Sequence, residues 1–281
     1  MKLSVIILSL TNTEELFKMI SNCINSLVES ESHISMEIIV VESNKNYSIS
    51  GFEYPGFVKV IIPPDDFNFH KFLNIGIKAS VGEYVALCNN DLIFYKNWFS
   101  EIMKISKEYP LIKSFSPSSK IDDYSFAKKM ELGYKVRTHI MGWCIVVNRE
   151  VFHKIGFLDE TFDFNYADND YAMTLKKYNI KHAIVSTSKV EHLEREKRNE
   201  KSDDEGVAYR KLQENVNFDL IKIPDYIYNR GYEFLLNDKK ALQDNIKFHK
   251  KWGSPNLLYR KNKIADLCIK LKIGFINKFI L

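Results

Sequence analysis

The chain has 281 residues, of which 45% are hydrophobic and 27% charged, an ordinary composition for a globular protein with a sizeable core. Its 40 basic and 36 acidic side chains give a formal net charge of +4. This mixed balance argues against nucleic acid as a partner, because nucleic-acid binders concentrate positive charge. The four cysteines are scattered without a CxxC pair, which argues against a disulfide framework or a zinc knuckle and favours a cytoplasmic setting.

The chain begins with an apolar stretch, Leu3 to Leu10, which is short for a signal peptide and has no small-residue cleavage site after it. We interpret it as a buried strand, and we expect Thr11 and Glu14 to form a capping box for the next helix. Up to residue 109, apolar runs predict strands at Val5–Leu8, Glu37–Val41, Val58–Ile62 and Tyr84–Cys88, and helical spacings predict helices around Leu16–Leu27, His70–Ser80 and Trp98–Tyr109. This alternation predicts an α/β fold with an open, mostly parallel sheet and helices on both faces.

The second half of the chain is less regular. The polar segment from Ser114 to Arg137 is expected to be a surface excursion, and Glu194 to Glu205 a solvated loop. Between them we predict a strand at Trp143–Val147, a short helix closed by Gly156, a helix at Asp168–Tyr178 and a strand at His182–Ser186. The remainder of the chain is predicted to be helical.

Three groups of residues directly follow predicted strands. In an α/β sheet, ligands bind beyond the carboxyl ends of the strands, so these groups are the first candidates for a binding site. They are Ser9, Leu10 and Thr11 after the first strand, Glu42 and Asn44 after the second, and Asn89, Asn90 and Asp91 after the fourth. Polar residues of this kind are common in turns, but their order and spacing favour one shared site.

The segment from Asn74 to Asp91 resembles the central motif of family 2 glycosyltransferases, in which NxGxxxAxG leads into a strand that ends in a DxD-type motif. Asn89-Asn90-Asp91 is similar to the NND variant of rhamnosyltransferase-like members. Further matches in the family's order are Gly156–Phe162 with GxFDExF, Ala167–Asp170 with EDxD, Val190–His192 with VxH and Lys251–Gly253 with KWG. Each motif is weak alone, and the ordered set carries the resemblance.

The resemblance implies a GT-A fold with a Rossmann-like sheet, and the inverting transfer of a sugar from a nucleotide-diphosphate sugar to an acceptor hydroxyl. The implied setting is bacterial surface glycan assembly on the cytoplasmic side, at the inner face of the membrane, with a glycan or lipid-linked acceptor. Residues 1–220 would form the glycosyltransferase domain, with a nucleotide-binding half to about residue 113 and an acceptor and catalytic half over 114–220. Residues 221–281 would form a helical C-terminal extension.

Roles for single residues follow from the same resemblance. Asp91 is implied as the principal ligand of a divalent cation, Mn²⁺ or Mg²⁺, and His192 as a second ligand. Such a cation neutralises charge on the leaving phosphate. Glu42 is implied to contact the nucleobase, and Asn74 to approach the nucleotide from its helix. Asn89 replaces the first aspartate of DxD, which removes one formal charge from the site.

Attack by an acceptor hydroxyl needs a carboxylate that accepts its proton. The resemblance implies Asp168 in this role and leaves Asp170 as a rival, because Ala167 replaces the glutamate that commonly precedes the aspartate. Both carboxylates lie at the start of a predicted helix about 200° apart, so only one points into a cleft. Trp143 is a candidate for the acceptor site, because aromatic faces stack on sugars, and a core position explains it equally well.

Other interpretations remain open. A non-catalytic subunit that binds nucleotide sugars would explain both Asn89 and Ala167 as lost functional residues. A nucleotidyltransferase is disfavoured, because the turn Ser9–Asn12 has neither the glycine nor the cation that holds a triphosphate. A dehydrogenase is disfavoured by the absence of GxGxxG at the same place. The apolar, lysine-containing tail Ile264–Leu281 predicts either a packed terminal helix or a helix on a membrane surface.

Overall fold

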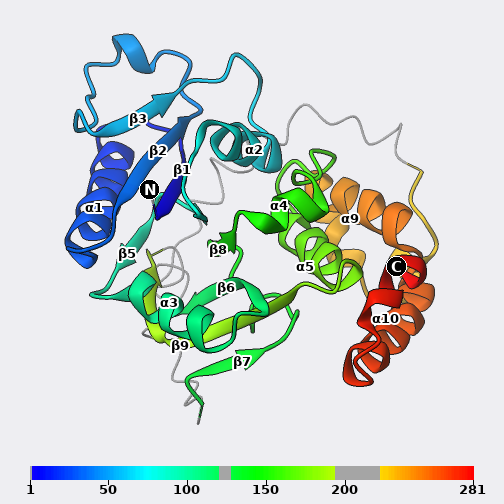
Figure 1. The fold of residues 1–281 in the computed structure, drawn as a ribbon. Helices are drawn as coiled ribbons and strands as arrows, with labels where there is room; N and C mark the ends of the chain where they lie inside the picture. The colour runs from blue at the N-terminus through cyan, green and yellow to red at the C-terminus, as the bar shows by residue number, and fades with distance from the viewer. Residues whose placement is uncertain (1, 120–127, 194–221) are drawn as a thin grey trace.

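The computed structural model describes residues 2–119, 128–193 and 222–281, and the predicted loop Glu194–Glu205 lies outside them. The described chain is an α/β structure built on a mixed sheet, with helices on both faces and more helices toward the C-terminus (Figure 1). The strands are β1 (Leu3–Ser9), β2 (Met36–Glu42), β3 (Val58–Ile61), β4 (Tyr84–Cys88), β5 (Leu92–Phe94), β6 (Ile112–Ser118), β7 (Met130–Leu132), β8 (Cys144–Asn148) and β9 (Lys181–His192). Their spatial order is β3-β2-β1-β4-β8-β6-β9-β5, and β7 pairs with β9.

The direction of the strands decides which residues meet. β1 lies parallel to β2 and β4, and β2 lies parallel to β3. β8 is antiparallel to both β4 and β6, so β6 points the same way as β4, and β9 is parallel to β6. β5 and β7 run against β9. The carboxyl ends of β1, β2, β4 and β9 therefore meet the amino end of β8 at one edge of the sheet, where α/β proteins bind ligands.

Helices cover both faces of the sheet because successive side chains of a strand point to opposite sides. The helices are α1 (Glu14–Ser30), α2 (Phe69–Ala79), α3 (Trp98–Glu108), α4 (Glu150–Ile155), α5 (Ala167–Lys177), α8 (Tyr226–Asn229), α9 (Lys239–Trp252), α10 (Pro255–Lys270) and α11 (Asn277–Ile280). Leu3, Val5 and Ile7 of β1 pack with the buried side chains of α1 and α3. Ile6 and Leu8 pack on the other face with those of α2, α4 and α5.

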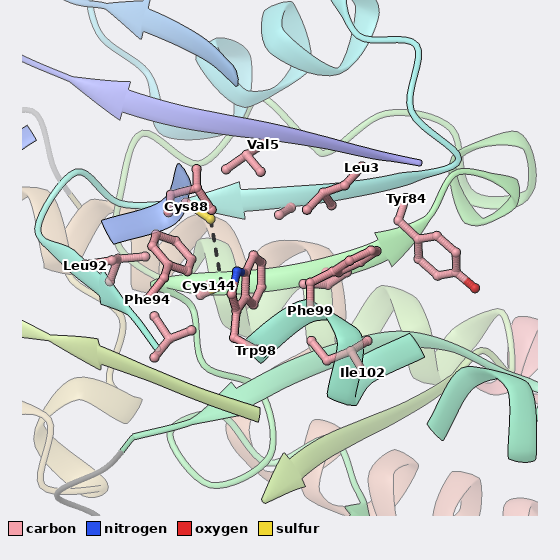
Figure 2. Close-up of a cluster of buried hydrophobic side chains, with 14 of the residues drawn as sticks. Leu3, Val5, Tyr84, Cys88, Leu92, Phe94, Trp98, Phe99, Ile102 and Cys144 are labelled. Carbon is pink, nitrogen blue, oxygen red and sulfur yellow. Dashed lines mark hydrogen bonds between the residues drawn. The ribbon is translucent and has the colours of Figure 1, made fainter. Parts of the chain in front are cut away.

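The core on the α1 and α3 side is rich in aromatic rings (Figure 2). Trp98 and Phe99 at the start of α3 are fully buried. Trp98 lies with its ring centroid 4.8 Å from that of Phe94, and Phe99 packs edge-on to Tyr84 at 5.8 Å. Complete burial of one such side chain contributes roughly 1.5–3 kcal/mol to folding. This cluster holds α3 against β6 and β9 on this face of the sheet.

The C-terminal helices form a smaller core of their own against α5. Phe248 and Trp252 of α9, Ala265 of α10 and the terminal Leu281 pack together with Met173 of α5. The predicted helical character of this region is confirmed for residues 222–281. Within the described ranges, no helix combines the length and apolar character needed to cross a bilayer.

One expected surface segment contains a buried strand. Residues 112–118 form β6 between β8 and β9, so the prediction of an irregular excursion from Ser114 is wrong for its first part. The alternating hydroxyls of Ser114, Ser116 and Ser118 are buried. Each has a partner: Ser114 Oγ lies 2.8 Å from the Tyr171 hydroxyl, Ser116 Oγ accepts from the Met141 amide, and Ser118 Oγ donates to the Ser186 carbonyl. Satisfied hydroxyls make a polar strand compatible with the core.

The predicted capping box is also wrong. Helix α1 begins after Thr13, whose side chain accepts a hydrogen bond from the Leu16 amide. The Thr11 hydroxyl is instead 2.7 Å from the Tyr54 hydroxyl, in a cluster at the ends of β1 and β2. Thr11 is therefore held by tertiary contacts rather than by the helix that follows it.

Two glycines of the central motif allow close packing against β1. A Cβ on Gly76 would collide with the Ile6 side chain, and one on Gly82 would lie 2.5 Å from the Ser4 backbone nitrogen. The Gly82 amide also donates to Ser4 Oγ at 2.7 Å. The spacing of these two glycines thus follows from how α2 and the next turn lie on β1.

We predict that Gly82→Ala lowers the free energy of unfolding by about 1–3 kcal/mol, because a backbone atom of β1 has little freedom to move away from the new methyl group. Urea unfolding followed by circular dichroism measures the effect. Gly56→Ala is the matched control, because nothing lies within 4 Å of its added Cβ, and it should change stability by less than about 1 kcal/mol. Equal midpoints for the two variants would contradict the packing role of Gly82.

Candidate active site at the carboxyl edge of the sheet

A buried carboxylate joins the ends of β1 and β2. Glu42 is fully buried, and its Oε1 accepts from the backbone amides of Thr11 at 2.9 Å and Asn44 at 2.8 Å. Its Oε2 accepts from the Tyr54 hydroxyl at 2.9 Å. The Asn44 side chain donates to the Thr11 carbonyl, and Ser9 Oγ lies 3.1 Å from Thr11 Oγ1. The structure therefore brings these predicted residues together, with Glu42 as the group that fixes the two loops.

Two further features at the ends of β1 and β2 are relevant to ligand binding. Leu10, between the buried Ser9 and Thr11, is 43% exposed. Tyr54 comes from the segment before β3, and its ring stacks on Tyr47 with centroids 5.1 Å apart. Burial raises the pKa of Tyr54 far above its usual value, so its hydroxyl stays protonated and donates to Glu42.

Asp91 and His192 lie side by side where β4 gives way to β5. The pairing of Leu92 with His192 in β5 and β9 sets this proximity. Asp91 Oδ2 is 3.2 Å from His192 Nε2, and Asn89 Nδ2 is 3.4 Å from the same nitrogen. Asp91 is only 8% exposed, and its other oxygen, Oδ1, is buried and has no hydrogen-bond partner among the residues that the structure describes. A buried carboxylate oxygen in that state is costly unless a cation or donor completes it.

Trp143 completes this cluster from the turn just before β8. Its ring lies parallel to the His192 imidazole, with 11° between the planes and 5.8 Å between centroids. Its carbonyl accepts from the Asn89 amide at 3.0 Å. Trp143 is half-buried, so it both packs on the core and reaches the edge of the sheet.

The donor set fits a hard divalent cation in part. Carboxylate oxygen and imidazole nitrogen are suitable ligands. A cation would also stabilise Asp91 Oδ1, which no described residue partners. Within residues 2–119, 128–193 and 222–281, no group of three His, Cys, Asp or Glu side chains is placed to hold a metal. A cation on Asp91 and His192 would need oxygen ligands from a bound molecule as well.

Asp168 lies close to the turn before β8 that carries Gly142 and Trp143. A Cβ added to Gly142 would be 3.1 Å from Asp168 Oδ2, so the missing side chain at Gly142 leaves room for this carboxylate. Asp168 Oδ1 accepts from the Asn169 amide at 2.8 Å. Burial raises the pKa of Asp168, and the positive charge of Arg137 opposes the rise. The result is a carboxyl group that holds a proton more readily than a solvated aspartate.

Asp170 points to a different part of the molecule. It is 2% exposed, and its Oδ1 accepts from the Trp252 indole at 2.8 Å and lies 2.6 Å from Lys251 Nζ. Lys251 also pairs with Asp159 at 2.7 Å. Burial raises the pKa of Asp170, and Lys251 opposes the rise. Asp170 thus joins α5 to the end of α9.

Asn74 is enclosed in the same way. Its amide donates to the Leu158 carbonyl and to Glu160 Oε1, both at 2.9 Å, and its oxygen accepts from the Leu158 amide at 3.0 Å. With 1% exposure, it ties α2 to the loop before α5. A direct contact of Asn74 with a nucleotide would require these bonds to break, and it stays a prediction.

A family model described as "Glycosyl transferase family 2" matches residues 4–182. The chain belongs to this family. Its members are enzymes that use nucleotide sugars. No curated protein matches the chain.

Solved structures of the same fold include GalNAc-T7 with UDP, GalNAc and Mn²⁺, which is 14% identical with a TM-score of 0.54 over 68% of this chain and 43% of that chain. TarS 1-349 of S. aureus is 16% identical, with a TM-score of 0.50 over 68% of this chain and 59% of that one. This family 2 glycosyltransferase therefore spans about half the length of these two proteins.

The structure explains two motifs of this glycosyltransferase through one contact. The second aspartate of the EDxD-like segment, Asp170, binds the Lys251 and Trp252 side chains of the KWG segment. Both motifs are visible in the sequence. The contact between them joins residues about 80 positions apart, and the sequence does not reveal it. Tyr54 lies in no motif and was not predicted, and no sequence signal distinguishes it from the many other tyrosines.

We predict that Lys251→Met lowers the free energy of unfolding by about 1–3 kcal/mol at neutral pH, because it leaves the Asp170 carboxylate buried without its cation. The loss should shrink at lower pH. Burial raises the folded-state pKa of Asp170, so the folded variant binds more protons than the unfolded chain and loses stability as the pH rises. Thermal unfolding across the pH range measures this, with the exposed neighbour Lys250→Met as control. A pH-independent deficit would count against the ion pair.

Proposed function

We propose that this chain is an inverting glycosyltransferase that moves one sugar from a nucleotide-diphosphate sugar to an acceptor hydroxyl. The observation that carries the proposal is the Asp91–His192 pair at the carboxyl edge of the sheet, with one buried Asp91 oxygen that no described residue partners. GalNAc-T7, which shares the fold, was crystallised with UDP, GalNAc and Mn²⁺. That complex supports UDP and Mn²⁺ as the first ligands to test.

In the proposed reaction, Asp91 and His192 hold a divalent cation, Mn²⁺ or Mg²⁺. When bound, the cation neutralises charge that develops on the leaving diphosphate. Asn89 brings an uncharged amide where DxD enzymes carry an aspartate, so Asp91 supplies the one formal negative charge of the Asn89-Asn90-Asp91 segment. This form agrees with a rhamnosyltransferase-like member of the family.

The nucleotide is proposed to lie over the loops that Glu42 fixes. Ser9 ends β1, Leu10 and Thr11 follow it, and Asn44 follows β2, so the groups nearest the edge come from both loops. Glu42 holds Thr11 and Asn44 through their amides and is proposed to orient the base. A rigid pair of loops binds a ligand with less loss of conformational entropy than two mobile ones.

Asp168 is proposed as the general base. Its raised pKa suits a group that must accept the proton of the acceptor hydroxyl as the new bond forms. Trp143 follows Gly142, which lies beside Asp168, and its ring stacks on the His192 imidazole. We therefore propose the Trp143 indole as part of the acceptor site.

The proposed organisation places the catalytic unit in residues 1–220, with its nucleotide-binding half ending near residue 113, and a helical extension in 221–281. The proposed acceptor is a glycan or a lipid-linked glycan, assembled on the cytoplasmic side at the inner face of the membrane. The proposal rests on the family and on the order of its motifs along the chain.

We predict that Mn²⁺ or Mg²⁺ strengthens binding of the nucleotide diphosphate at least about tenfold, a difference of about 1.4 kcal/mol. Isothermal titration of UDP, GDP and dTDP with and without the ion measures this. Asp91→Ala should abolish the strengthening and His192→Ala should weaken it, whereas Glu108→Ala on the surface of α3 should leave it unchanged. Metal-independent binding of every nucleotide would overturn the metal assignment.

We predict that Asp168→Asn slows turnover by roughly 10² to 10⁴ with donor affinity nearly intact, as expected for loss of a general base. Asp170→Asn should mainly lower the melting temperature, because Asp170 holds Trp252 and Lys251. In the native enzyme the rate should fall as the pH drops through the raised pKa of Asp168, and the variant should lose this acid limb. An inactive Asp170→Asn beside a fully active Asp168→Asn would reverse the assignment. Donor binding with no turnover on any acceptor would support a non-catalytic subunit.

A further inference from the structure

Helix α10 carries two apolar arcs, and the core uses only one of them. Leu258, Ala265 and Cys268 are buried. Leu257, Ile264, Leu267 and Leu271 are 48%, 51%, 54% and 59% exposed. At 100° per residue, these four side chains fall within about 80° of the helix circumference, next to the buried arc. We call them the α10 stripe.

The α10 stripe is surrounded by positive charge. Residues 255–281 contain six basic side chains, Arg260, Lys261, Lys263, Lys270, Lys272 and Lys278, and a single acid, Asp266. Asp266 is already paired with Lys176 of α5 at 2.9 Å. By helical position, Arg260 falls inside the stripe, and Lys263 and Lys270 border it.

A pocket of about 510 Å³ lies at the start of the same helix. Its lining consists of Arg230, Tyr232, Pro255, Asn256, Tyr259 and Arg260. Among the described residues, two guanidinium groups and no carboxylate line it, which is the chemistry that binds phosphate. Because Arg260 lines the pocket and falls among the α10 stripe residues by helical position, the anion site and the apolar surface are continuous.

We propose that the α10 stripe and the pocket between Arg230 and Arg260 form a docking surface for an anionic phospholipid membrane. The leucine and isoleucine side chains enter the interface between headgroups and acyl chains, and the two arginines bind lipid phosphate. An apolar stripe bordered by lysine and arginine is the pattern of a helix that lies in the plane of a membrane surface. The proposal does not depend on the transfer reaction.

Charge favours this occupant over a second copy of the chain. A symmetric dimer through the stripe would place Arg260 and its lysine neighbours opposite their own copies, because a twofold interface brings the same patch together. Like charges facing each other disfavour such a contact. The exposed rings that follow, Phe275 at 64% and Phe279 at 78%, extend the apolar character of the tail beyond α10.

Point substitutions test this surface better than removal of the tail. Ala265 and Leu281 belong to the core with Phe248 and Trp252, and the Asn277 side chain donates to the carbonyls of Lys176 and Ala265. A chain that ends before residue 264 would therefore lose part of its core as well as the stripe.

The experiment is co-sedimentation of the full chain with vesicles of phosphatidylcholine and phosphatidylglycerol in equal parts, against phosphatidylcholine alone. We expect binding to the anionic vesicles only, weakened by salt. Leu267→Glu should lower the partition coefficient more than tenfold, and Arg230→Gln by about fivefold, the effect of one cation at an anionic surface. Leu111→Glu, at a position 71% exposed, and Lys107→Gln on α3 are the matched controls and should bind as the native chain does. Melting temperatures show that each variant is folded.

Several results would overturn the proposal. These are absence of binding to anionic vesicles, equal binding to neutral ones, and native-like binding by Leu267→Glu. If the Arg230→Gln variant binds as tightly as the native chain, the phosphate pocket is not part of the docking surface. Self-association in sedimentation velocity that Leu267→Glu abolishes, without vesicle binding, would assign the stripe to a second copy instead.

Discussion

The candidate site depends on the direction of the strands, and above all on the reversal of β8. Because β8 is antiparallel to β4, Cys144 lies opposite Cys88, and the residues just outside these two positions, Trp143 and Asn89, stand side by side. A parallel β8 would carry Trp143 to the far end of the sheet. β9 runs with β6 and ends at His192, so its last residue arrives at the same edge. Asp91 and His192, about a hundred positions apart in the sequence, thus meet at one edge of the sheet.

The four carboxylates that the sequence offers as functional candidates differ in how far the protein satisfies them. Glu42 accepts three hydrogen bonds and Asp170 binds an indole and an ammonium, so each is compensated for its burial and holds two elements together. Asp91 keeps one buried oxygen with no hydrogen-bond partner among the described residues. Burial raises the pKa of both Asp168 and Asp170, but Asp170 is paired with Lys251, whereas Asp168 lies beside Gly142. A carboxylate that the fold leaves uncompensated is expected to meet a ligand or a proton. Asp168 and Asp170 lie about 200° apart on α5, so the two carboxylates have different surroundings.

The parts of the fold that were predicted from the sequence are those with strong local signals. The limits of β4 were predicted correctly because Tyr84–Cys88 is continuously apolar, and α2 differs from its prediction by one residue at each end. β6 was missed because its serines indicate a surface, and only partners far along the chain, such as Tyr171, make their burial possible. β5 is three residues long and exists through its pairing with β9. The residues after β1, β2 and β4 were placed correctly at one edge, whereas the enclosure of Glu42 and Asn74 depends on Tyr54 and Leu158, which no local pattern connects to them.

The tail shows the same limit in another form. Its composition is apolar nearly all round, and composition alone does not separate a packed helix from a surface helix. In the structure, adjacent arcs of α10 differ in burial: Ala265 and Cys268 are packed in the core, and Ile264 and Leu267 are exposed. Lys176 near the end of α5 binds Asp266 and Asn262 of α10, and Asp168 lies at the start of α5, about 12 Å away along its axis. A surface on α10 is therefore held in a fixed relation to the carboxylate proposed as the base. A membrane bound at the α10 stripe, as proposed, would hold a lipid-linked acceptor in a fixed relation to this carboxylate.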